Sequence, residues 1–175
     1  NQSSFIGNNE ILLTQDMTYQ VGQVWSKNRI DFSNSFTFSF DAYSGTKDAT
    51  GADGLAIVFH NSPAGTSASG SAGGGMGAAD IPNGIVLELD TYQNSDNGDP
   101  AADHGQIWLS QNRTSLTTPV SLPNLENGNW NNVVVNWNKA TNTLSYTVNG
   151  TLAGSYSNDI VNSVFGGNNN VHFGF

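Results

Sequence analysis

The sequence contains no cysteine, so no disulfide framework can hold the fold and the redox compartment cannot be read from it. Positive charge is scarce: 5 Lys and Arg residues stand against 14 Asp and Glu residues, which gives a net charge of -9. Nucleic acid and anionic membrane surfaces would repel such a chain, and we expect it to bind neither. No apolar run reaches the length of about 18 residues that a membrane-spanning helix needs, so we expect no membrane insertion.

Helical periodicity is missing as well, and short strand patterns take its place. The clearest is segment 35–44, where three phenylalanines alternate with small polar residues and indicate a stripe that faces a core. Further strand patterns follow at regular spacing, with a strong hairpin signal at Asn149-Gly150 and one short helical turn within 157–166. A chain of 175 residues with this pattern favours one all-β domain, an antiparallel sandwich.

Acidic residues gather between Asn83 and Asn112, and the rest of the chain is organised around this stretch. It opens as a strand whose strict alternation places Glu88 and Asp90 on one face, opposite the leucines. The chain then passes through a run of turn formers and returns as a second strand. The carboxylates of the stretch therefore crowd one strand end and its loop: Glu88, Asp90, Asp96, Asp99 and Asp103.

A bound cation is the simplest source of positive charge for this cluster. No Lys or Arg occurs between Lys47 and Arg113, so the sequence predicts that no basic side chain lies among the carboxylates, which repel one another. Asn94 and Asp99 add oxygen ligands suited to a hard cation, and His104 adds an imidazole that a transition metal prefers. The plainer alternative is a solvated acidic loop.

A second unusual stretch, residues 61–84, is rich in glycine and almost without large side chains. A linker is one interpretation, although neither half of the chain alone shows enough strands to close a core. A phosphate-binding loop does not fit, because no Lys-Ser or Lys-Thr follows the glycines and no helix pattern begins there. The third interpretation is a functional loop whose backbone N–H groups approach a ligand closely.

These stretches together resemble a known family. Residues at fixed spacing are similar to the metal loop of legume lectins and their bacterial and animal relatives, the L-type lectins: Glu88, Asp90, Tyr92, Asn94, Asp99 and His104. Segment 51–56 resembles the Ala-Asp-Gly loop of that family, and glycines 70–77 stand where the family keeps a second sugar-binding loop. The resemblance extends over nearly the whole chain, and in detail it is most similar to bacterial surface adhesin modules.

The resemblance implies a jelly-roll sandwich of the concanavalin A type with two adjacent metal ions. Asp90 and Asp99 would bridge the ions, and calcium would add Asn94 and the main-chain carbonyl of Tyr92. A possible second site, for Mn2+ or another transition metal, would add the glutamate and the histidine of the same loop. The donor types agree, since oxygen ligands suit calcium and an imidazole suits a transition metal.

The resemblance also implies a sugar site beside the metals. Asp53, preceded by a cis peptide bond, would accept hydrogen bonds from two vicinal hydroxyls, and Asn94 would donate its amide to the same sugar. A main-chain N–H of Gly74 or Gly75 would meet a further hydroxyl, and Tyr92 would place its ring on the apolar face of the sugar. The plainer interpretation of Asp53 is a turn residue before a strand.

The chain ends at Phe175, where relatives continue through another loop and a closing strand. We therefore expect one lectin-like domain over residues 1–175 that lacks its C-terminal closing strand. A neighbouring domain or chain is expected to cover the sheet edge that this leaves. His60 and His172 have no carboxylate at metal spacing and are expected to be ordinary strand histidines.

These features predict a calcium-dependent carbohydrate-binding module of a secreted or cell-surface bacterial protein, which binds glycans or polysaccharide in adhesion. One alternative is a structural adhesin spacer that has lost its sugar site. Another is a jelly-roll glycoside hydrolase, which would need a third carboxyl group two or three residues after Asp90. Tyr92 and Gln93 stand there instead, so no enzyme activity is expected.

Overall fold

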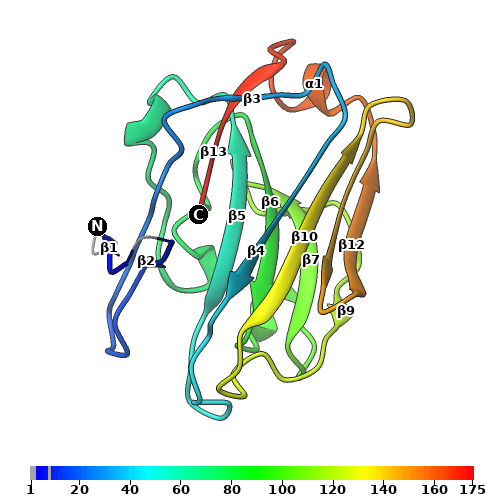
Figure 1. Ribbon diagram of the computed structural model, residues 1–175. Helices are drawn as coiled ribbons and strands as arrows, with labels where there is room; N and C mark the ends of the chain where they lie inside the picture. Colours follow the sequence, from blue (N-terminus) through cyan, green and yellow to red (C-terminus); the bar gives the residue numbers. More distant parts are fainter. Residues whose placement is uncertain (1–2, 8) are drawn as a thin grey trace.

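The computed structural model describes residues 3–7 and 9–175 as a sandwich of two antiparallel sheets with a two-stranded hairpin beside it (Figure 1). The strands are β1 Ser4–Phe5, β2 Ile11–Leu12, β3 Ile30–Asp31, β4 Phe36–Ala42, β5 Gly54–His60, β6 Gly84–Asp90, β7 His104–Leu109, β8 Thr114–Ser115, β9 Val120–Ser121, β10 Asn131–Asn138, β11 Thr143–Val148, β12 Thr151–Ser157 and β13 Asn170–Gly174. Helical structure in the described residues is limited to α1 and three short 3-10 turns: Ile160–Ser163, Gly65–Ser67, Gly73–Gly75 and Ser95–Asn97. The expected all-β fold and its single helical turn are confirmed.

The larger sheet has the order β3-β13-β5-β6-β7-β8, and β9 also pairs with β7. Its central strand β6 is buried along its whole length because both of its faces are covered. The isoleucine and leucines of β6 face the core between the sheets, whereas Val86 packs on the other side against Ala78 and Ala79 of the glycine loop. The face that carries Glu88 and Asp90 is therefore also covered, and the expected alternation is confirmed.

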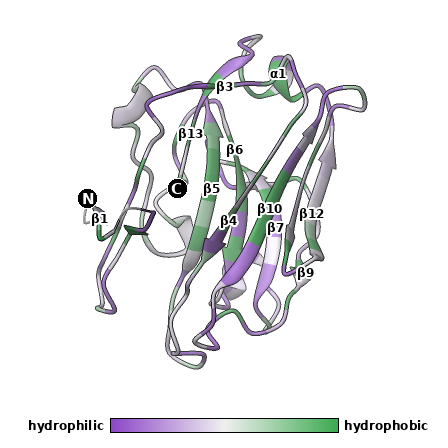
Figure 2. Ribbon diagram, viewed as in Figure 1, coloured by the Kyte–Doolittle hydropathy of each residue, from purple (hydrophilic) through white to green (hydrophobic). Residues whose placement is uncertain are grey.

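The smaller sheet has the order β12-β11-β10-β4 and closes the core from the other side. The three phenylalanines of β4 are partly buried and pack against that core, so the expected stripe is confirmed. Trp137 and Phe32 are fully buried, and the Trp137 indole N–H donates to the Phe32 carbonyl at 3.0 Å. In Figure 2 the apolar residues, drawn in green, concentrate on β5, β6 and β10 in the middle of the molecule.

Two smaller expectations are also confirmed. Asn149 and Gly150 join β11 to β12 with φ angles of 49° and 82°, the backbone that a tight hairpin turn requires. His60 and His172 are opposite one another on β5 and β13 and are buried strand residues. Within the described part of the chain no helix has the length and apolar character that crossing a membrane requires.

The C-terminal strand β13 lies inside the larger sheet, between β3 and β5. Where the short β3 no longer pairs with β13, the N-terminal segment takes its place: Phe175 exchanges two backbone hydrogen bonds of 2.9 Å with Val24. In the smaller sheet, β4 is an end strand among the described residues. The expectations of a missing closing strand and of a neighbour that covers an edge stay predictions.

Candidate functional site

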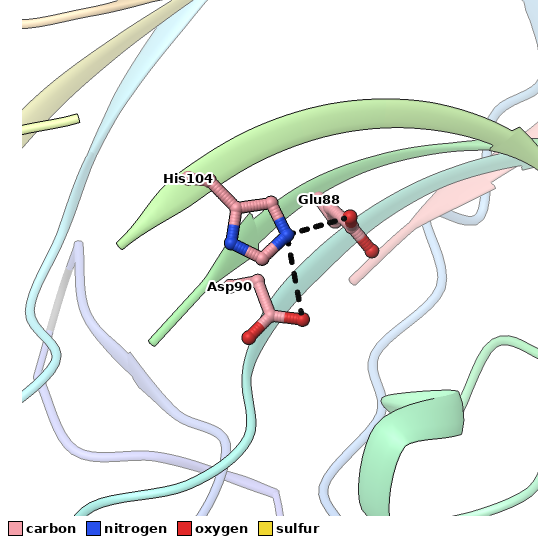
Figure 3. Close-up of side chains that lie close together, drawn as sticks. All are labelled: Glu88, Asp90 and His104. Carbon is pink, nitrogen blue, oxygen red and sulfur yellow. Dashed lines mark ion pairs between the residues drawn. The ribbon is translucent and has the colours of Figure 1, made fainter. Parts of the chain in front are cut away.

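Strands β6 and β7 bring three of the expected metal ligands to one point. The register pairs Asp90 with His104, and Glu88 lies two residues before Asp90, so the three side chains share one face of the sheet. His104 Nε2 lies 3.5 Å from a Glu88 oxygen and 4.0 Å from an Asp90 oxygen, as drawn in Figure 3. Asp99 reaches the same point from the loop after β6, with an oxygen 3.7 Å from His104 Nε2.

The side chains of this cluster are buried, and the atoms that face one another lack hydrogen-bond partners. Glu88 and Asp90 are 0% exposed, His104 is 1% exposed and Asp99 is 6% exposed. One oxygen of each carboxylate, together with His104 Nε2, has no hydrogen-bond partner among the described residues. A buried polar atom without a partner costs about 1–3 kcal/mol, so an ion among these atoms would remove several such costs.

The crowding also shifts the protonation of these groups. Burial, together with the carboxylates of Glu88 and Asp99, raises the pKa of Asp90 to about 7 against the opposing hydrogen bond from the Tyr92 N–H. Burial alone would lower the pKa of His104, but the carboxylates of Glu88, Asp90 and Asp99 around its ring outweigh this effect and raise that pKa. Burial is the larger cause of the Asp90 shift, and the neighbouring carboxylates raise both pKa values.

Arg113 supplies part of that charge, and the expectation that no basic side chain lies among the carboxylates is wrong. Its guanidinium lies 3.5 Å from Glu88 and 4.0 Å from Asp90, and its side chain is only 17% exposed. It also covers the Trp108 ring at 4.9 Å from the centroid, while the Trp108 indole N–H donates to Glu88 at 2.5 Å. The guanidinium pairs with two of the three carboxyl groups of the cluster, and no ion pair joins it to Asp99 among the described residues.

The loop after β6 adds oxygen donors at the same place. The Asp90 carboxylate accepts the Tyr92 N–H at 2.8 Å, and the Asp99 carboxylate accepts the Asn94 N–H at 2.9 Å. These bonds occupy one oxygen of each carboxylate, and the other oxygen is the buried one without a partner among the described residues. The Asn94 side-chain oxygen is in the same condition.

Asp53 lies beside the start of this loop. Its carbonyl accepts the Thr91 N–H at 3.0 Å, and the peptide bond between Ala52 and Asp53 is cis, as expected. Burial raises the pKa of the half-buried Asp53 carboxyl, and the Arg113 guanidinium opposes that shift.

Gly54, the first residue of β5, allows this strand to start close to the end of β6. It pairs with Asp90 and has a φ of 135°, and a Cβ there would stand 2.1 Å from the Leu89 carbonyl oxygen. Only glycine therefore permits this approach, which places the preceding Asp53 next to the acidic cluster.

Comparison with known proteins shows the family of this chain. The family described as the legume lectin beta-barrel domain matches residues 1–175. The chain belongs to this L-type lectin family. Lectin II from Ulex europaeus superposes with a TM-score of 0.74 at 22% identity, over 94% of this chain and 76% of that chain. Winged bean acidic lectin, solved with methyl-alpha-D-galactose, gives a TM-score of 0.72 at 24% identity, over 99% and 79% of the respective chains. At these identities the two lectins show the jelly-roll fold alone.

Curated relatives include bacterial proteins that are far longer than this domain. Pesticidal crystal protein Cry22Aa of Bacillus thuringiensis is 45% identical over 83 residues, which make up 47% of this chain and 11% of that protein. The serine-rich adhesin for platelets of Staphylococcus aureus is 34% identical over 95 residues, 53% of this chain and 7% of that protein. The lectin-like chain thus spans only a small part of the curated relatives that it matches.

The donors in this L-type lectin domain fit the metals that the family implies. Asp90, Asn94 and Asp99 each hold a buried oxygen without a partner among the described residues, which suits calcium. Glu88, Asp90 and His104 each offer one ligand atom within 4.8 Å of the others, and an imidazole with carboxylates suits a transition metal.

The glycine loop of the lectin domain meets the metal loop at Gly74. A Cβ at Gly74 would lie 2.8 Å from the Asn94 side-chain oxygen, so the two loops are in contact here. The Gly75 N–H is already bonded to the Ala72 carbonyl at 3.3 Å, whereas the Gly74 N–H has no partner among the described residues. Tyr92 is 47% exposed. Gly74 is therefore the better placed of the two glycines, and its role toward sugar stays a prediction.

Sequence reasoning missed Trp108 and Arg113. A signal for Trp108 was present, because it follows His104 by four residues in a strand and so shares its face. Arg113 had no such signal. It reaches the cluster because β8 folds back on β7, with Trp108 paired to Ser115 and Leu109 to Thr114.

Proposed function

We propose that this lectin domain is a calcium-dependent carbohydrate-binding module of a secreted or cell-surface bacterial protein, and that it binds glycans in adhesion. The observation that carries the proposal is the placement of Asp53 and Gly74 against the metal loop. Asp53 is bonded to that loop through Thr91, and Gly74 touches Asn94. Three different loops thus bring polar groups to the rim of one buried acidic cluster.

Calcium would be held by Asp90, Asn94, Asp99 and the main-chain carbonyl of Tyr92, and it would supply a fixed positive charge that holds the loop in place. Its three side-chain ligands each hold an oxygen that has no hydrogen-bond partner among the described residues. With its oxygen on the ion, the Asn94 side chain keeps its amide group as a donor. The same cluster offers Glu88 and His104 to a second ion, Mn2+ or another transition metal.

Sugar recognition would rest on three groups beside the metal loop. The Asp53 carboxylate would accept hydrogen bonds from two adjacent hydroxyls, and Gly74 would donate its main-chain N–H. The exposed ring of Tyr92 would stack on the apolar face of the sugar. Winged bean acidic lectin was solved with methyl-alpha-D-galactose, so galactosides are a rational first class of glycan to test.

Burial argues against the glycoside hydrolase alternative. Glu88 is 0% exposed and is enclosed by Trp108 and Arg113, so a glycosidic bond cannot reach it. A hydrolase of this kind also needs a carboxyl group two or three residues after Asp90, where Tyr92 and Gln93 stand. These observations support binding without catalysis.

The test is a glycan array in calcium, followed by calorimetry of the parent and three variants with the glycan that binds. Asp53→Ala should abolish glycan binding and leave calcium affinity nearly intact, whereas Asp90→Ala should abolish both. Asp96→Asn is the matched control, because Asp96 is an exposed acid of the same loop. If Asp53→Ala binds glycan as tightly as Asp96→Asn does, the sugar site is elsewhere. If no glycan on the array binds the calcium-loaded parent, the spacer interpretation replaces the proposal.

A further inference from the structure

A second group of carboxylates lies outside the lectin metal loop, where three loops meet. Asp48 comes from the loop between β4 and β5, Asp103 directly precedes β7, and Glu126 comes from the loop before β10. One oxygen from each lies within 4.8 Å of the others. Asp48 is exposed, Asp103 is half-buried and Glu126 is buried, so the group extends from the surface into the protein.

Glu126 is the unusual member. It is only 4% exposed, and its Oε2 atom has no hydrogen-bond partner among the described residues. Its Oε1 atom lies directly against Gly51, in the loop that carries Asp48, so closely that a Cβ at Gly51 would overlap it. A buried carboxylate in such a place needs a counter-charge or a proton.

The surrounding backbone holds this carboxylate in place. The Glu126 N–H donates to the Asn124 side chain at 2.7 Å, and the preceding Leu125 N–H donates to the Asp103 carboxylate at 2.6 Å. The Asn131 side chain donates to the Leu125 carbonyl at 2.9 Å. Two of the three acids are therefore tied to one another through the backbone of a single short loop.

No basic side chain of the described residues pairs with these acids. Lys47 is adjacent to Asp48 in the chain, but its ammonium group pairs with Asp16 at 2.7 Å instead. Burial, and the carboxylates of Asp103 and Asp48, raise the pKa of Glu126 to about 7. The charge that Arg113 provides in the first cluster has no counterpart here.

We propose that Asp48, Asp103 and Glu126 form a further cation site, and that its ion is calcium. The donors are all oxygens, with no imidazole or thiolate, and this is the ligand set of a hard divalent cation. The exposed Asp48 gives the ion access from solvent. The ion would join the loop that ends in Asp53 to the start of β7, and so would brace two sides of the lectin site independently of the first calcium.

The test counts calcium ions by equilibrium dialysis with elemental analysis, on the intact chain at saturating calcium. Glu126→Gln and Asp48→Asn should each bind one calcium ion fewer than Glu10→Gln, the matched control in which an exposed glutamate loses the same charge. Asp90→Ala should lose the ion of the metal loop and keep this one, so failure of the proposed lectin function would not be mistaken for failure of the further site. If both variants bind as many ions as Glu10→Gln, the proposal is overturned.

Thermal melting gives a second, independent measurement. In chelator, Glu126→Gln should melt no lower than the parent, because it removes repulsion among three acids. In calcium it should gain fewer degrees than the parent and Glu10→Gln gain. An equal gain for all three proteins would mean that Glu126 carries a proton rather than facing an ion, and would overturn the proposal. Asp48→Asn repeats this measurement at an exposed position where folding is not at risk.

Discussion

We predict that Arg113 and a bound metal ion compete for the same carboxylates, and that replacing Arg113 by methionine separates the two sources of positive charge. Methionine keeps an unbranched apolar chain beside Trp108 and removes the guanidinium with its charge and its N–H donors. With an effective dielectric constant of about 20, the 3.5 Å contact to Glu88 and the 4.0 Å contact to Asp90 are each worth about 4 to 5 kcal/mol before desolvation. Desolvation offsets much of this, so we expect a net loss of about 2 kcal/mol in metal-free protein.

Calcium should offset most of this loss of stability. With the guanidinium gone, the carboxylates attract the ion more strongly, and we expect about tenfold tighter binding, equivalent to about 1.4 kcal/mol. Because the ion binds only the folded state, the variant should recover most of its lost stability in saturating calcium. Urea denaturation of the parent and the variant, in chelator and in calcium, measures their free energies of unfolding. Calorimetry measures their calcium affinities.

The control for this experiment is Arg29→Met. Arg29 is an exposed arginine whose guanidinium donates to the Asn170 carbonyl at 3.2 Å, away from the acidic cluster. It should change stability by less than about 0.5 kcal/mol in both conditions. If Arg113→Met loses the same free energy with and without calcium, or binds calcium less tightly than Arg29→Met, then Arg113 is a structural partner and not a competitor of the ion.

Two further predictions concern β5. Burial and the charge of His172 lower the pKa of His60 from 6.5 to about 4. Between these pH values the histidine is protonated in the unfolded chain and neutral in the folded chain. Stability should therefore fall as the pH drops from about 6.5 towards 4, by up to about 3 kcal/mol, and His60→Gln should flatten this part of a urea-denaturation profile; an unchanged slope would contradict it. Gly54→Ala, which forces a Cβ against the Leu89 carbonyl at positive φ, should cost about 3 kcal/mol or more and abolish glycan binding, while Gly7→Ala, with open space around it, should melt like the parent.

The sequence by itself determined the strands and much of the metal loop. Alternation along β6 placed Glu88 and Asp90 on one face, because successive side chains of a strand point to opposite sides. The loop that follows is full of turn formers and leads back into a second strand, so Asn94 and Asp99 were expected near the strand end. Local rules of this kind need no knowledge of distant parts of the chain.

Tertiary structure decided which distant groups meet these residues. Arg113 joins the cluster only through the pairing of β8 with β7. Glu126 meets Asp48 only because two loops that each connect the two sheets pack together. Whether a buried carboxylate faces a guanidinium, a proton or an ion depends on such contacts, since charge interactions act through space rather than along the chain. The sequence supplies the carboxylates of both acidic clusters, but only the fold determines which positive charges lie near them.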